Sequence, residues 1–280
     1  MIKSNWRAFL LLGGAALALF AQQDNATRVA WNRPVAPFQI IGNIYYVGAE
    51  GVASYLITTP RGSILLDSGL PETAPQVEKN ITTLGFKVKD VKFLLNSHAH
   101  YDHCGGLAEL KRVTGAQMVA SRADGEILER GGPPGRPAWQ FAAVKVDRFI
   151  KDGETVELGG TRLTAVVTPG HTPGCTTWTM PVMDAGKRLN VVFYCSTSVV
   201  ERLHDNKDYP AIVSDYQRSF ERLKMLPCDV FLGPHPGFFH MDEKLARMKP
   251  GAPNPFIDPA ELHQYVLESE QAFEVELKKP

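Results

Sequence analysis

The chain has 280 residues, of which 44% are hydrophobic and 21% charged, and its 30 basic residues balance 30 acidic ones. This length is enough for one large hydrophobic core or two modest ones. A protein that binds a polyanion should show a basic excess or a cluster of Lys and Arg, and this chain shows neither. We therefore expect no nucleic-acid partner.

The N-terminus has the pattern of a secretory signal peptide. Lys3 and Arg7 precede an uncharged, apolar run over residues 8–20, after which the sequence turns polar. We predict a signal peptide over residues 1–21 and a single domain over 22–280. The run is shorter than the ~20 residues that span a bilayer, and an uncleaved membrane anchor is the alternative. We expect a periplasmic or secreted protein with no membrane contact once the signal is removed.

Hydrophobic periodicity after the signal predicts short strands and helices separated by Gly and Pro turns. The sequence order is strands followed by helices, twice, without a flexible linker between the halves. This order predicts an α+β fold in which two sheets pack face to face with helices outside. Strands are expected at 38–41, 44–47, 53–57, 62–66, 91–95, 116–119, 143–149, 154–158, 162–167, 176–180, 189–194 and 229–230, and helices at 72–84, 106–113, 123–130, 210–225, 242–247 and 259–278.

Four potential metal ligands follow the strand expected at 91–95. His98, His100, Asp102 and His103 form an H-x-H-x-D-H string. Imidazole together with carboxylate suits zinc and its first-row neighbours, whereas calcium and magnesium prefer oxygen alone. In an extended segment positions two apart project the same way, so His98 and His100 can bind one ion. Asp102 and His103 are adjacent to each other and approach from another direction, so the string predicts two metal ions.

Two further histidines lie in rigid loops directly after strands: His171 within Thr-Pro-Gly-His-Thr-Pro-Gly, and His235 within Gly-Pro-His-Pro-Gly. Asp67 also ends a buried strand. It is a candidate acceptor for the second N–H of a ligand histidine, or alternatively a turn residue before glycine. The other histidines lack this setting and are expected at the surface or in packing contacts: His204, His240 and His263.

The four cysteines allow three disulfide pairings if all of them are oxidised, and export would permit disulfides. Cys104 follows the H-x-H-x-D-H string, and Cys175 lies four residues after His171. If both loops converge on the metals, these two sulfurs could bond, although free thiols are equally compatible with the sequence. Cys195 and Cys228 complete the set.

With these features in place, the chain resembles the metallo-β-lactamase superfamily over nearly everything after the signal. More narrowly, it resembles the third subclass of the class B β-lactamases. The resemblance implies a four-layer αββα sandwich, in agreement with the layers expected above. The matching segments are Leu66-Asp67-Ser68-Gly69, the H-x-H-x-D-H string, Pro169-Gly170-His171-Thr172-Pro173-Gly174, Val191-Val192-Phe193-Tyr194-Cys195-Ser196 and Gly233-Pro234-His235-Pro236.

The resemblance implies two Zn²⁺ ions per chain. The first would be held by His98, His100 and His171, and the second by Asp102, His103 and His235. Glyoxalase II-like hydrolases and lactonases of the superfamily have a bridging aspartate at the position that Ser196 takes here, and the first β-lactamase subclass has a cysteine ligand. A register shifted by one residue would make Cys195 that ligand.

The activity implied is hydrolysis of the β-lactam amide bond of penicillins, cephalosporins and carbapenems by a zinc-bound hydroxide, which confers antibiotic resistance. Asp102 would place the second zinc and relay a proton, and Ser196, Ser198 and Gln140 would contact substrate. One alternative is a related hydrolase of a lactone, thioester or phosphodiester, and another is a non-catalytic zinc-binding protein. We expect a monomer whose partner is the small-molecule substrate.

Overall fold

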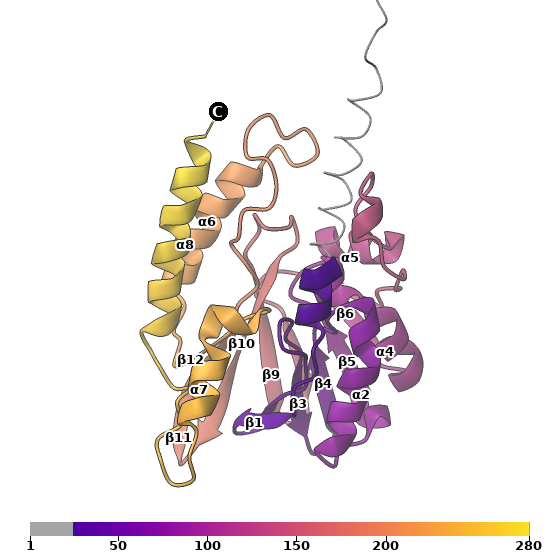
Figure 1. The fold of residues 1–280 in the computed structure, drawn as a ribbon, viewed down its shortest axis with the longest axis vertical. Helices are drawn as coiled ribbons and strands as arrows, with labels where there is room; N and C mark the ends of the chain where they lie inside the picture. The colour runs from indigo at the N-terminus through magenta and orange to yellow at the C-terminus, as the bar shows by residue number, and fades with distance from the viewer. Residues whose placement is uncertain (1–24, 280) are drawn as a thin grey trace, which may run out of the picture.

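Two β-sheets lie face to face at the centre of the computed structural model, which describes residues 25–279 (Figure 1). The signal peptide predicted at residues 1–21 lies outside the described residues. Helical backbone over residues 25–31 precedes the first strand.

The first sheet has seven strands, and their spatial order is their order along the chain. The first four form an antiparallel meander, and the last four are parallel to one another. They are β1 (Phe38–Ile41), β2 (Ile44–Tyr46), β3 (Tyr55–Thr59), β4 (Gly62–Leu66), β5 (Val91–Leu95), β6 (Gln117–Ser121) and β7 (Arg148–Ile150).

The second sheet has five strands in the order β12-β11-β10-β9-β8. Its pairs are antiparallel except β11 with β12, which are parallel. The strands are β8 (Thr155–Leu158), β9 (Thr161–Val167), β10 (Thr176–Asp184), β11 (Lys187–Phe193) and β12 (Val230–Leu232).

Short and medium helices connect and cover the sheets. Among the described residues, none of the helices has the length and apolar character needed to cross a membrane. Besides the helical residues 25–31, the α-helices are α2 (Ala74–Thr83), α3 (Tyr101–Cys104), α4 (Leu107–Thr114), α5 (Arg122–Arg130), α6 (Ile212–Lys224), α7 (Met241–Arg247) and α8 (Glu261–Leu277). The 3₁₀ turns are η1 (Pro71–Thr73), η2 (Val88–Asp90), η3 (Pro137–Trp139) and η4 (Pro236–Phe239).

Burial of apolar side chains defines four layers. Helices α2, α4 and α5 cover the outer face of the first sheet, and α6 and α8 cover the outer face of the second (Figure 1). One core cluster fills the space between the sheets and reaches α6 and α8, with Ile64, Trp178 and Phe220 among its members. The other cluster, which includes Leu65 and Leu110, lies between the first sheet and its helices. The predicted αββα sandwich is confirmed.

Two strand predictions need correction. The strand expected at 143–149 begins only at Arg148, as β7. Before that point the carboxylate of Asp147, and not a backbone carbonyl, accepts the backbone N–H of Met118 in β6 (2.8 Å). Conversely, the strand expected at 176–180 ends at Met180, whereas β10 continues through Pro181 to Asp184. Pairing with β9 stops at Thr179, so the missing N–H of the proline faces no partner strand.

Candidate metal centre

The predicted ligands meet because five strands end at the same edge of the sandwich. A polar residue of interest follows each of these strands within a few positions: Asp67 after β4, His98 after β5, His171 after β9, Ser196 after β11 and His235 after β12. Strands β4 and β5 are parallel, as are β11 and β12, and β9 runs in the same direction as β11. Polar residues that are far apart in sequence therefore converge between the two sheets.

His98, His100 and His171 form the first group of potential ligands. Their ring centroids are 4.6–4.8 Å apart, and the Nε2 atoms of His98 and His171 are 3.2 Å apart. His98 and His100 project the same way from an extended segment, as predicted. All three imidazoles can reach a single ion between them.

Asp102, His103 and His235 form the second group. The Nε2 atoms of His103 and His235 are 3.2 Å apart, and Asp102 Oδ2 lies 3.2 Å from the first and 3.6 Å from the second. Asp102 and His103 lie in α3, a single helical turn, and the ring of His103 lies 4.3 Å from the ring of His98, so the two groups adjoin each other. The structure therefore brings all six predicted ligands together, in the two sets expected.

Contacts on the far side of the rings favour the neutral, metal-binding tautomer. The Nδ1 of His171 is 2.7 Å from the carbonyl oxygen of Ser198, and the Nδ1 of His235 is 2.8 Å from that of Gly51. A carbonyl only accepts, so each Nδ1 carries the hydrogen and each Nε2 lone pair faces the site. The Nδ1 of His98 lies 3.0 Å from the hydroxyl of the preceding residue, Ser97. These residues fit a divalent ion, and zinc in particular accepts such a nitrogen and oxygen set.

Burial keeps four of the imidazoles neutral. Desolvation and the neighbouring rings lower the pKa of His98 and His100 well below the usual value. Burial also lowers the pKa of His171 and of His235 to about 4. His103 differs: burial opposes its charge, but the adjacent carboxylate of Asp102 outweighs burial and raises the pKa of His103. A metal ion that binds the second group must therefore displace a proton from His103, whereas the histidines of the first group are already neutral.

Asp67 has a different partner from the one predicted. Its carboxylate accepts the backbone N–H of Ser97 (2.7 Å) and so fixes the start of the metal-binding loop. The Nδ1 of His103 has no hydrogen-bond partner among the described residues, so the expected bond from a ligand histidine to Asp67 is not formed there. Burial raises the pKa of Asp67 to about 6, and His103 and the Ser97 N–H oppose that rise.

Five of the six candidate ligands, all but His98, line a cavity of about 880 Å³. Aromatic rings form much of its wall: Trp139 lies 4.9 Å from the ring of His100, while Trp31 and Phe238 each lie 5.2 Å from the ring of His235. A cavity of this size, with apolar walls and a few convergent polar groups, suits a small organic ligand.

Two of the three predicted substrate contacts line this cavity. Ser196 is buried and its hydroxyl accepts the backbone N–H of Ser198 (3.2 Å), and both serines face the cavity. Gln140 does not. It is exposed, and its amide nitrogen donates to the carbonyls of Pro133 (2.8 Å) and Arg136 (3.1 Å), within its own loop. Its neighbour Trp139 takes the position at the cavity wall.

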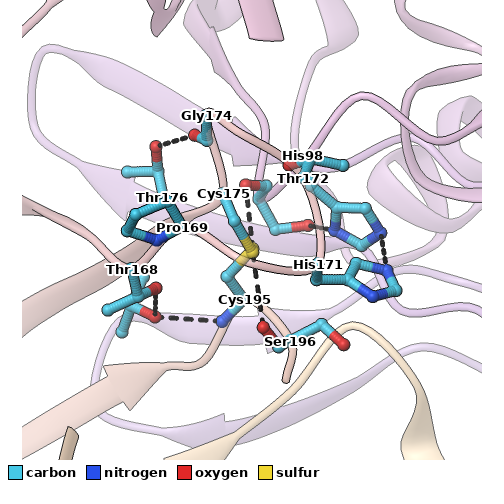
Figure 2. The surroundings of a disulfide bond; sticks show 12 residues. His98, Thr168, Pro169, His171, Thr172, Gly174, Cys175, Thr176, Cys195 and Ser196 are labelled. Carbon is cyan, nitrogen blue, oxygen red and sulfur yellow. Dashed lines mark hydrogen bonds between the residues drawn. A yellow bond between two sulfur atoms is a disulfide. The ribbon is translucent and has the colours of Figure 1, made fainter. Parts of the chain in front are cut away.

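A disulfide joins the loops that carry His171 and Ser196 (Figure 2). It links Cys175, just before β10, to Cys195, just after β11, with the Cα atoms 5.9 Å apart. All four cysteines lie within residues 25–279, and Cys104 and Cys228 remain free thiols. The possible Cys104–Cys175 bond is therefore wrong, and Cys195 is not available as a metal ligand.

The sequence reasoning missed the helix at residues 25–31, whose side chains complete the cavity. Asn25, Arg28 and Trp31 line it. Arg28 is held in place by a two-point ion pair with Glu72 (2.6 and 2.7 Å). The signal that could have drawn attention to this segment is Trp31, a large aromatic residue that follows Val29 and Ala30.

Comparison with known proteins identifies the family. Residues 47–235 match the family model described as the metallo-beta-lactamase superfamily, and the chain belongs to this superfamily. It is similar to the crystal structure of BJP-1, a subclass B3 metallo-β-lactamase of Bradyrhizobium japonicum. The identity is 48%, the TM-score is 0.86, and the match covers 89% of this chain and 96% of that one. FEZ-1, a metallo-β-lactamase from Legionella gormanii, is 43% identical with a TM-score of 0.86, over 88% of this chain and 97% of that one. The resemblance to the third subclass is confirmed.

Similarity to curated proteins is more distant and partial. A hydroxyacylglutathione hydrolase from Hyphomonas neptunium is 29% identical over 47% of this chain and 43% of its own length. A probable metallo-hydrolase from Burkholderia pseudomallei is 28% identical over 51% of this chain and 42% of its own length. The chain thus spans less than half the length of these relatives.

Proposed function

We propose that the protein hydrolyses the amide bond of β-lactam antibiotics and uses two zinc ions to do so. The observation that carries this proposal is the pair of adjoining ligand groups, His98/His100/His171 and Asp102/His103/His235, of which all members but His98 line one cavity. Similarity over almost the whole chain to BJP-1, a subclass B3 metallo-β-lactamase, supports the choice of substrate.

The six side chains suit this chemistry because they are buried, close together and mostly neutral. Zinc, when bound, lowers the pKa of a bound water to near 7 and polarises a carbonyl oxygen. The neutral imidazoles of His98, His100 and His171 present nitrogen lone pairs to the first ion. Asp102 contributes the negative charge of the second group and lies where it can accept and pass on a proton.

The cavity wall provides the remaining contacts to substrate. The hydroxyls of Ser196 and Ser198 are placed to seat the substrate carboxylate, directly or through water. The rings of Trp31, Trp139 and Phe238 give apolar surface for the substituents of the lactam and exclude water around the ligand groups.

Thioester hydrolysis is the second candidate, because a hydroxyacylglutathione hydrolase is among the relatives. Two observations favour the β-lactam. The resemblance noted in the sequence implies that Ser196 stands where glyoxalase II-like hydrolases have a bridging carboxylate. The hydroxyacylglutathione hydrolase matches only about half of this chain. A non-catalytic zinc protein is disfavoured because structural zinc sites are closed, whereas both groups here face an open cavity.

The direct test is turnover of nitrocefin and imipenem by the purified protein, before and after dialysis against a chelator. We expect turnover of both substrates, its loss on chelation, and its return when zinc is added. Efficient hydrolysis of a thioester or lactone, with both β-lactams untouched, would reject the proposal. Activity that persists after verified removal of the metal would reject the mechanism.

Acid should release the two metals in sequence. At pH 5.5 the first group is largely unprotonated, since burial lowers the pKa of His171 to about 4 and the pKa values of His98 and His100 well below the usual value. Zinc at the second group must displace a proton from His103, whose pKa is raised. We expect two zinc ions per chain after dialysis at pH 7.5 in a zinc buffer, and one at pH 5.5, retained at the first group. Metal analysis of the wild type beside His235→Ala checks this. Parallel loss of both ions would contradict it.

Ser196→Ala should weaken substrate binding and leave both metals in place. A hydrogen bond to a charged group contributes about 1.5–3 kcal/mol, so we expect KM to rise roughly 10-fold or more with a smaller change in kcat. Steady-state kinetics and zinc analysis measure the two effects. Ser214→Ala, on the exposed face of α6, is the matched control. If Ser196→Ala lost one zinc, the ligand assignment would be wrong.

We also propose that residues 22–280 form a single exported domain that acts as a monomer and protects its host from β-lactams. The signal pattern at residues 1–21 and the disulfide between Cys175 and Cys195 support export, because disulfides form and persist in oxidising compartments. Subcellular fractionation tests the export, and size-exclusion chromatography of the mature protein tests the monomeric state.

A further inference from the structure

Asp124 is a buried carboxylate that the proposed mechanism does not use. It lies in the first turn of α5, is 1% exposed, and accepts three hydrogen bonds. None of the six candidate ligands donates a hydrogen bond to it; the donors are Ala99, Thr172 and Gly174.

The donors belong to the two loops that carry the first ligand group. Oδ2 accepts the backbone N–H of Ala99 (2.9 Å), the residue between His98 and His100. The same oxygen accepts the hydroxyl of Thr172 (2.8 Å), the residue after His171. Oδ1 accepts the backbone N–H of Gly174 (2.9 Å), the residue before the disulfide cysteine. One carboxylate thus ties a loop of the first sheet to a loop of the second.

Packing leaves this arrangement little freedom. A Cβ placed on Gly174 would lie 2.6 Å from Asp124 Oδ1 and 2.3 Å from the hydroxyl of Ser121, so the loop approaches α5 as closely as a glycine permits. Ser121 in turn donates to the carbonyl of Gly174 (2.6 Å). Figure 2 shows Thr172 and Gly174 on the chain between His171 and the disulfide.

We propose that Asp124 is a positioning residue that sets the affinity of the His98/His100/His171 group for a divalent metal. This inference rests on the proposed two-metal site. Histidines from two different sheets can hold one ion only if their loops keep a fixed separation, and Asp124 bonds to both loops beside the ligands. Asp124 accepts no hydrogen bond from a member of the second group, so the zinc affinity of that group should not depend on this residue.

The test measures zinc binding to each group separately, by competition with a chromophoric chelator. In a His235→Ala background the first group is the intact one, and in a His171→Ala background the second is. Asparagine has one acceptor oxygen and an NH₂ group, so Asp124→Asn keeps at most two of the three hydrogen bonds. Its NH₂ group would also face an N–H or O–H donor of a ligand loop, with which it cannot bond. We expect Asp124→Asn to weaken zinc binding roughly 10- to 100-fold in the first background and less than about 3-fold in the second.

Two smaller variants keep the test decisive if Asp124→Asn fails to fold, which circular dichroism would reveal. Thr172→Val removes one donor, keeps the side-chain shape, and should weaken zinc binding in the first background only. Thr172→Ser retains the hydroxyl and should restore wild-type affinity. Asp147→Asn is the matched control, because Asp147 also accepts a backbone N–H but lies beside β6 and β7, away from the cavity.

Unchanged zinc affinity in the His235→Ala background would overturn the proposal, as would an equal loss in both backgrounds, which indicates a general effect on folding. The outcome does not depend on the substrate. If the protein bound zinc as described but hydrolysed no β-lactam, the proposed function would fail while the role of Asp124 would stand.

Discussion

His171→Ala is expected to lower kcat/KM for imipenem by on the order of 10³-fold or more. Loss of a residue that merely orients a metal ligand costs roughly 10- to 100-fold, and loss of the ligand itself should cost more. His171 is also the only member of the first group on the second sheet, so its removal leaves His98 and His100 without a partner across the cavity. Steady-state kinetics with metal analysis should show one zinc ion lost.

The matched control is His263→Ala, because His263 is exposed on α8 and does not line the cavity. It should retain both zinc ions and the kcat/KM of the wild type. A His171→Ala variant with near wild-type kcat/KM would mean that the first group does not hold the catalytic metal.

Trp178→Ala is expected to destabilise the protein by about 3–5 kcal/mol. Trp178 on β10 is fully buried between the sheets, and its indole N–H donates to the carbonyl of Asn96 (3.0 Å), two residues before His98. The substitution leaves a cavity and a buried carbonyl without its donor, and about 3–5 kcal/mol is a large part of the stability of an ordinary domain. Urea unfolding of the metal-free protein measures the change.

Two companion variants separate the causes. Trp178→Phe keeps most of the volume and loses the N–H, so it should cost about 1–3 kcal/mol. Met183→Ala, on the same strand but 60% exposed, should change stability by less than about 0.5 kcal/mol. A cost below about 1 kcal/mol for Trp178→Ala would show that the core between the sheets does not depend on this ring.

The ligand set could be predicted from sequence because its signals are local. His98, His171 and His235 each follow a short apolar run and sit in a polar, Gly- or Pro-containing loop, and these patterns are visible without any long-range contact. The alternation of strands and helices gave the layers for the same reason. Strand ends at one edge of a sheet then bring such residues together.

Features that depend on which loops meet could not be predicted. Asp124 bonds to residues 25 and 48 positions away, and its own surroundings in the sequence are those of an ordinary first-turn helix residue. Cys104 is buried between the first sheet and its helices, whereas Cys175 and Cys195 flank neighbouring strands of the second sheet, so the pairing follows from the sheet order. The side chain of Gln140 donates to carbonyl oxygens of its own loop and so points away from the cavity, and no sequence pattern indicates this orientation.

The bond between Cys175 and Cys195 has a consequence for how the protein is made. In a reducing cytosol the same chain would carry two thiols here, and only noncovalent contacts, such as the hydrogen bond from His171 to Ser198, would join the two loops. Recombinant material from the cytosol and from an oxidising compartment are therefore two different covalent molecules. The redox history of a preparation belongs beside its zinc content whenever activities are compared.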